Sequence, residues 1–250
     1  RKLSTSGAIS SIYEIYNPPL VVRTLFFIIG FNLQYKKNNN NLSAGVKLCN
    51  AFQEMGTTFI KLGQFLATRP DIIGENISKD LEKLQDKLPA FNLFEAKNIL
   101  KNEIKKENFN QIINLSEPIA AASIAQVHFA KIKLNGQTKE VAVKILRPDI
   151  EKIFNDELDA LMLLAYIIEN LLKKTKRLKL VEVVQLLREI TNIEMDLRFE
   201  AAAANELYEN TKNDLSFVVP KIFWNHTSKK VLCLEKVDGI SIRETEKLKS

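Results

Sequence analysis

The twenty residues Val127–Leu146, VHFAKIKLNGQTKEVAVKIL, decide the fold. The first eight alternate apolar and polar side chains, which is the period of a half-buried strand. Asn135-Gly136 then gives the sequence of a tight two-residue turn, and the last six residues read as a second strand. We therefore predict an antiparallel hairpin. It places Val141 and Val143 on one face and Lys144 on the other, since neighbouring side chains of a strand point to opposite faces.

Helical patterns lie on both sides of this hairpin, which predicts an α+β fold with an antiparallel sheet. Before it, the spacing of apolar residues and the capping residues predict helices over Ser43–Phe65, Ser78–Leu88 and Phe94–Lys105. After it, we predict long helices over about Asp149–Lys174 and Leu180–Asn210, followed by strands over Phe217–Phe223 and Val231–Val237.

Composition and charge narrow the function classes. The 250 residues are 46% hydrophobic and 26% charged, as in an ordinary folded chain, and two cysteines do not make a disulfide scaffold. The net charge of +6 suggests an anionic partner. The densest basic run, Lys173–Arg177, has no interleaved aromatic residues, so we expect a solvated linker rather than a nucleic-acid site. His128 and His226 have no companions at metal-ligand spacing, and we expect His128 on the strand surface.

One apolar stretch could contact a membrane. Leu20–Phe31, LVVRTLFFIIGF, is shorter than the roughly 20 residues of a span and is interrupted by Arg23. A helix on the bilayer surface and a core helix are both compatible with it.

Lys144 is the residue with the clearest chemistry. In protein kinases the lysine of a V-A-I-K strand holds the α- and β-phosphates of ATP and pairs with a glutamate on a helix. The alternative is an exposed lysine on an edge strand. The segment before the strand, where a kinase has its glycine-rich loop, is Ala120–His128, and it contains no glycine. Each Cβ there restricts the backbone and its approach to a phosphate.

Three more blocks complete a resemblance. They are Lys61-Leu62-Gly63-Gln64 (K-x-G-Q), Glu194-Met195-Asp196 (E-x-D) followed by Phe199-Glu200, and Val231–Gly239. With these in order over residues 43–242, the chain resembles the UbiB family, the AarF-type atypical kinase-like proteins associated with ubiquinone biosynthesis. The resemblance implies a kinase-like N-lobe behind an N-terminal helical extension, with ATP and Mg²⁺ as cofactors of the intact protein.

The resemblance also implies a nucleotide site. Lys144 would contact the phosphates, with Glu200 as its ion-pair partner. Ala120, Ala121, Ala122 and Ser123 would form an alanine-rich loop above the phosphates. Glu235 and Val237 would offer backbone groups to the adenine.

A regulatory set belongs to the helical extension. Lys61 and Gln64 lie three residues apart and so share a helix face. The resemblance implies that Lys61 meets Glu194 or Asp196 where a peptide substrate would sit, which would block protein-kinase activity. A surface pair is the simpler alternative.

The domain plan follows from these motifs: an apolar segment and linker over 1–42, the extension over 43–117, the N-lobe over 118–237, and the start of a C-lobe over 238–250. Neither H-x-D-x-x-x-x-N nor Asp-Phe-Gly occurs in the sequence, so we expect an N-terminal portion without a C-lobe, catalytically incomplete and inactive alone. Expected partners are ATP, the C-terminal half, membrane lipid and ubiquinone-biosynthesis proteins, at the cytoplasmic face of a membrane or in the cytoplasm. A non-catalytic lipid- or partner-binding module is the alternative.

Overall fold

A computed structural model describes residues 42–84, 88–171, 173–240 and 248. The stretch Leu20–Phe31 lies outside the described residues. Within them the chain divides into two compact units. The helical unit comprises the described residues up to Leu84 together with those from Glu151 to Ile190, and the sheet unit comprises those from Leu88 to Ile150 and from Thr191 onward.

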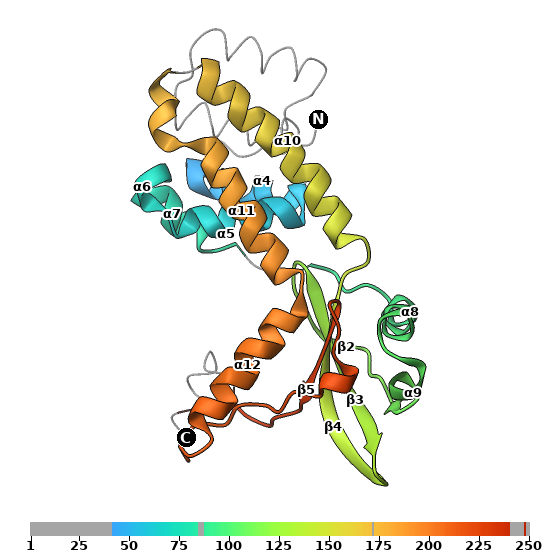
Figure 1. The fold of residues 1–250 in the computed structure, drawn as a ribbon. Helices are drawn as coiled ribbons and strands as arrows, with labels where there is room; N and C mark the ends of the chain where they lie inside the picture. Colours follow the sequence, from blue (N-terminus) through green and yellow to red (C-terminus); the bar gives the residue numbers. More distant parts are fainter. Residues whose placement is uncertain (1–41, 85–87, 172, 241–247, 249–250) are drawn as a thin grey trace. The chain divides into compact units, whose positions relative to one another are not determined.

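The helical unit is built from short helices followed by two long ones (Figure 1). Its elements are α4 (Ala44–Met55), α5 (Thr57–Ala67), α6 (Pro70–Ile73), α7 (Glu75–Leu81), α10 (Ile150–Leu171), the 3-10 helix η1 (Lys173–Leu178) and the part of α11 (Leu180–Glu194) up to Ile190. Buried apolar residues of α4 and α7, with Leu84 beyond, form a core: Leu48, Cys49, Phe52, Leu81 and Leu84.

Two helix predictions in this unit need correction. The predicted helix Ser43–Phe65 is broken at Gly56, where φ of 105° is a conformation that favours glycine. The helix predicted over Ser78–Leu88 is α7, which begins three residues earlier, after Gly74, and ends at Leu81. Ser78 is not its cap. Its buried hydroxyl lies inside the helix and donates to the carbonyl of Ala67 at 2.5 Å.

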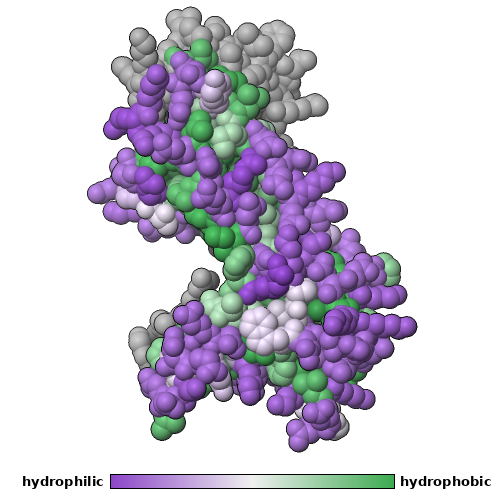
Figure 2. All heavy atoms as spheres, in the orientation of Figure 1, coloured by the Kyte–Doolittle hydropathy of each residue, from purple (hydrophilic) through white to green (hydrophobic). Residues whose placement is uncertain are grey.

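The surface of the helical unit carries exposed apolar side chains along its long helices (Figure 2). On α10 these include Leu163 and Leu171, and on α11 Leu186 and Ile190. None of the helices in the described part of the chain combines the length and apolar character that a membrane span requires.

The sheet unit contains the predicted hairpin. Its strands are β1 (Ile112–Ile113), β2 (Pro118–Ala121), β3 (Ala125–Leu134), β4 (Gln137–Leu146) and β5 (Val231–Glu235), in the order β1-β3-β4-β5 with β2 also paired to β3. All pairings are antiparallel. Asn135 and Gly136 both have positive φ, 49° and 79°, as a tight hairpin turn requires. The hairpin and the α+β class are confirmed.

Each face of the sheet has its own helix. On one face α8 (Leu93–Glu103) contributes Ala96 and Leu100 to a core that contains Val141, Val143 and Ile145. On the other side of the sheet lies α12 (Leu197–Thr211), which packs against β5 (Figure 1). The short helices α9 (Lys106–Phe109) and η2 (Trp224–His226) contact each other beside α8. Because β4 lies between β3 and β5, Lys144 is not on an edge strand, and that alternative is wrong.

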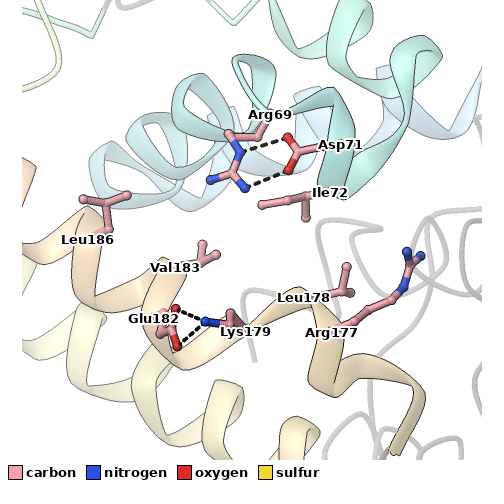
Figure 3. A pocket seen from close by; sticks show the side chains of 9 residues that line it. All are labelled: Arg69, Asp71, Ile72, Arg177, Leu178, Lys179, Glu182, Val183 and Leu186. Atoms are coloured by element: carbon pink, nitrogen blue, oxygen red, sulfur yellow. Dashed lines mark hydrogen bonds and ion pairs between the residues drawn. The ribbon is translucent and has the colours of Figure 1, made fainter.

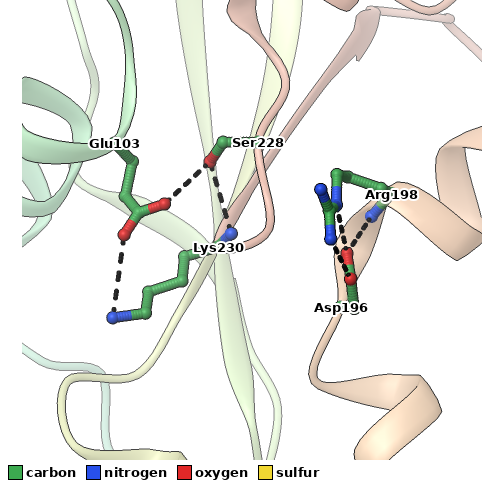
Figure 4. Close-up of polar contacts among 5 residues, drawn as sticks. All are labelled: Glu103, Asp196, Arg198, Ser228 and Lys230. Atoms are coloured by element: carbon green, nitrogen blue, oxygen red, sulfur yellow. Dashed lines mark hydrogen bonds and ion pairs between the residues drawn. The ribbon is translucent and has the colours of Figure 1, made fainter.

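Polar contacts join α8 to the start of β5 (Figure 4). The hydroxyl of Ser228 donates to a carboxylate oxygen of Glu103 at 3.2 Å, and the ammonium of Lys230 lies 3.7 Å from the other oxygen. The Lys230 amide also donates to the Ser228 hydroxyl. These contacts hold the C-terminal end of α8 beside the start of β5. The other end of β5 leads to Val237.

Three predictions in this unit were wrong. The helix predicted over Leu180–Asn210 is two helices, α11 and α12, because the chain turns at Met195-Asp196 and Asp196 caps α12. Phe217–Phe223 is not a strand and makes a single bridge, Ile222 to Leu234. His128 is fully buried rather than on the strand surface.

Candidate functional site

The ion pair between Lys144 and Glu200 is the centre of the candidate site. The Lys144 ammonium lies 2.7 Å from one Glu200 carboxylate oxygen and 3.0 Å from the other. Strand alternation directs Lys144 away from the core, because Val143 and Ile145 fill the opposite face. On α12 the buried Ala201 lies beside Glu200 in the chain. The resemblance predicted this pair, and the structure contains it.

Both partners remain accessible to solvent. The Lys144 side chain is 26% exposed and that of Glu200 is 49% exposed. A pair this exposed contributes only about 0–1 kcal/mol to folding. The pair therefore adds little to the stability of the fold.

The strand register places the alanine-rich segment beside Lys144. Ala120 on β2 is opposite Val127 on β3, which is opposite Lys144 on β4, which is opposite Leu232 on β5. Residues directly opposite in antiparallel strands point to the same face. One row across the sheet thus brings Ala120, Val127 and Lys144 to one side.

We call Ala120–Ser123 the alanine loop. None of its residues is among those with positive φ. The loop therefore adopts a backbone that does not require glycine, which explains how alanine can occupy it. The Ala122 amide donates to the Ala125 carbonyl at 2.8 Å and closes the turn into β3. Ser123, the last residue of the loop, is fully buried.

Two residues that sequence reasoning missed share the Lys144 face. Ala142 is two positions before Lys144, and Leu234 is opposite Ala142 on β5. Both are partly buried. Counting by twos along β4 from Lys144 would have found Ala142. These side chains give the face an apolar floor next to the ion pair.

The two backbone candidates at the end of β5 differ. The amide of Glu235 already donates to the Lys221 carbonyl at 2.8 Å. Val237 lies two residues past the end of the strand, with 50% of its surface exposed. Of the two, Val237 is the better placed to meet a ligand.

The four regulatory candidates divide between the units. Lys61 and Gln64 lie one turn apart on α5, both partly buried. Glu194 and Asp196 lie at the junction of α11 and α12. The contact of Lys61 with either acid stays a prediction.

Asp196 has a local partner that the sequence did not reveal. Arg198 donates to it through its side chain at 2.6 and 2.9 Å and through its backbone amide at 3.1 Å (Figure 4). The hydrogen bonds from Arg198 hold the pKa of Asp196 below its usual value, against the opposing effect of burial. Asp196 is thus a charged helix cap.

A separate pocket lies in the helical unit, between α6 and the start of α11 (Figure 3). Its volume is about 270 Å³. Two of its cations are already paired, Arg69 with Asp71 at 2.7 Å and Lys179 with Glu182 at 2.9 Å. Sequence analysis did not identify this pocket, because its two walls are more than a hundred residues apart.

A buried polar network lies behind the alanine loop. Gln126 accepts from the Phe91 amide, so its own amide group must donate, and it lies 2.9 Å from His128 Nε2. His128 Nε2 is therefore the acceptor, and Nδ1 donates to the Ser116 carbonyl at 2.7 Å. This arrangement requires a neutral imidazole.

Stability should consequently fall in mild acid. Burial lowers the pKa of His128 below 6.5, despite the Ser116 carbonyl and the charge of Glu117, and burial likewise lowers that of His226. A lowered folded pKa means that the unfolded chain binds more protons, so stability is present above pH 6.5 and is lost below it. We expect the free energy of unfolding to drop by up to about 1.4 kcal/mol per pH unit for each histidine.

Urea unfolding at pH 7.5, 6.5 and 5.5 measures this loss. His128→Gln and His226→Gln, compared in parallel, should each remove part of the slope. Equal stability of the original chain at pH 7.5 and 5.5 would contradict the assignment of neutral, buried imidazoles.

Comparison with known proteins defines the class. The profile of the ABC1 atypical kinase-like domain matches residues 83–250. A relative from Marinobacter nauticus named "Probable protein kinase UbiB" is 38% identical over 83% of this chain. Relatives of the same name from Aeromonas salmonicida and Cellvibrio japonicus are 32% and 34% identical over 95% and 81% of it. The chain therefore belongs to the UbiB family of ABC1 atypical kinase-like proteins, which confirms the resemblance.

The chain spans 38%, 42% and 36% of the lengths of these three relatives. The kinase-like domain is consistent with ATP and Mg²⁺ as ligands in general.

Proposed function

We propose that this chain forms the nucleotide-binding lobe of a UbiB-type atypical kinase or ATPase that supports ubiquinone biosynthesis. The observation that carries the proposal is the Lys144–Glu200 pair, which lies on the same sheet face as Ala120 of the alanine loop.

The pair suits a phosphate ligand. An ammonium group has three donors, and Glu200 accepts from it at two distances, 2.7 and 3.0 Å. A phosphate oxygen can take a remaining donor while Glu200 keeps the side chain extended along the sheet. The partial exposure of Lys144 leaves that approach open.

The rest of the nucleotide has a matching surface. Ala142 and Leu234 provide apolar surface on which a flat base could lie. Val237, three residues after Leu234, can supply backbone hydrogen bonds to the base edge. The alanine loop, whose Ala120 lies in the same row as Lys144, would cover the phosphates.

The described residues fit the nucleotide better than its metal. No group of three or more His, Cys, Asp or Glu side chains within them could hold a metal ion. The sequence also lacks the motifs that supply Mg²⁺ ligands and the catalytic Asp in kinases. Mg²⁺ would enter bound to the nucleotide, where it neutralises phosphate charge.

The proposal makes a two-part prediction for the purified 250-residue chain. Calorimetric titration should detect ATP binding, and release of phosphate or ADP in the presence of Mg²⁺ should stay at background. Lys144→Ala should abolish the binding. Absence of ATP binding would refute the proposed lobe, and Mg²⁺-dependent turnover that Lys144→Ala abolishes would refute the catalytic incompleteness.

A further inference from the structure

We propose that Arg147 is the positioning residue of the alanine loop, and that it ties this loop to the connector Leu88–Asn92 that precedes α8. The part of this inference that concerns nucleotide rests on the proposed function. The part that concerns loop order stands on the hydrogen bonds alone.

Arg147 reaches the loop from the end of β4. Its Nε and Nη2 both donate to the Ala122 carbonyl, at 3.1 and 2.8 Å. Its backbone amide donates to the Ile124 carbonyl at 2.9 Å. Arg147 therefore holds the segment that leads from the alanine loop into β3 at two carbonyl groups, those of Ala122 and Ile124.

These hydrogen bonds fix the orientation of the peptide group between Ala122 and Ser123. The Ala122 amide is bonded to the Ala125 carbonyl, and the Ala122 carbonyl is bonded to the guanidinium. A trans peptide is planar, and its C=O and N–H point in opposite directions. With the Ala122 carbonyl drawn to Arg147, the amide of Ser123 must point away from Arg147. The side chain thus sets the direction of a backbone donor in a loop that the proposed function places over phosphates.

The same guanidinium also holds the connector. Nη1 donates to the Pro89 carbonyl at 2.9 Å. Two residues further on, both backbone groups of Phe91 are bonded to the buried Gln126, which directly follows the loop exit. Arg147 and Gln126 thereby hold the connector against both sides of the turn that closes the loop.

Charge and geometry both favour arginine here. The rigid guanidinium fork presents several donors in fixed directions, so it can serve two carbonyls at once. A lysine would keep the charge but could not hold both carbonyls in the same plane. Arg147→Lys therefore separates the effect of charge from the effect of geometry.

The test compares Arg147→Lys and Arg147→Met with the original chain and with the matched control Arg188→Lys. Arg188 is an arginine of the helical unit that bonds Asp159 at 2.6 Å and lies outside the proposed site. The first measurement is amide hydrogen exchange without nucleotide. We expect exchange about tenfold faster in residues 120–126 and 88–92 for both Arg147 variants, because the guanidinium hydrogen bonds that hold both segments are lost. The control should show no change.

The second measurement is binding of ATP and of adenosine. Both Arg147 variants should bind ATP about three- to tenfold more weakly and adenosine unchanged, since the loop would contact phosphates and not the base. A merely structural role would weaken both ligands equally and speed exchange throughout the sheet unit.

Three results would overturn the proposal. They are unchanged exchange in residues 120–126 of a folded Arg147→Met chain, full protection restored by Arg147→Lys, and failure of both variants to fold, which would make Arg147 a residue of global stability. If the original chain does not bind ATP, the proposed function fails, and hydrogen exchange still decides the role of Arg147.

Discussion

Lys144→Met should weaken ATP binding by at least about tenfold while the chain stays folded. The variant removes the ammonium that pairs with Glu200 and that the register places in one row with Ala120 of the alanine loop. A charged hydrogen bond to phosphate is worth about 1.5–3 kcal/mol, and 1.4 kcal/mol is a factor of ten in affinity. The exposed ion pair adds little to folding, so stability should change by less than about 1 kcal/mol.

Lys139→Met is the matched control for this variant. Lys139 lies on the same strand, paired with Ile132 near the hairpin turn and exposed. Calorimetry should show ATP affinity unchanged in Lys139→Met and weakened by at least about tenfold in Lys144→Met. Equal affinities in the two variants would show that the ligand binds elsewhere.

Gly63→Ala should be strongly destabilising, although it adds one methyl group. A Cβ built on Gly63 would meet Leu84 inside contact distance and lie 2.6 Å from a ring carbon of Phe52. Both neighbours belong to the buried core of the helical unit, so they cannot move aside freely. Overpacking of this kind costs about 1–3 kcal/mol. This gives a packing reason for the glycine of the K-x-G-Q motif.

Chemical denaturation followed by helical circular dichroism measures that loss. Gly239→Ala is the control, because a Cβ there meets no atom within 4 Å and its φ is not positive. The control should match the original chain within about 0.5 kcal/mol. A Gly63→Ala chain as stable as the control would mean that α5 and its neighbours pack more loosely than the structure shows.

Local sequence patterns predicted the helices and strands whose structure depends mainly on their own residues. The hairpin is one example. Its alternating apolar and polar residues determine which face of the sheet each side chain is on, and the Asn-Gly turn determines the strand register. The position of Lys144 opposite the core followed directly. The identity of its partner did not, since Glu200 is 56 residues further along the chain. That pair was predicted only through the resemblance.

The wrong predictions have a common physical cause. The helix break at Met195-Asp196 is set by a side-chain cap, Asp196, inside a continuous helical pattern. The burial of His128 depends on Gln126 and on the Ser116 carbonyl, which no periodicity reveals. Arg147 was overlooked because its partners are carbonyl groups, and backbone acceptors leave no mark in a sequence. Residues held by distant backbone groups therefore have to be read from the structure.

The central claim is that ATP binds the sheet face around Lys144. Titration of the isotopically labelled 250-residue chain with ATP, followed by backbone nuclear magnetic resonance, tests it most directly. We predict saturable shifts at Ala120–Ser123, at Ala142 and Lys144, and at Leu234 and Val237, with adenosine reproducing only those at Ala142, Leu234 and Val237. Saturating ATP that leaves these signals unchanged, or that shifts only the pocket around Arg69 and Lys179, would contradict the account.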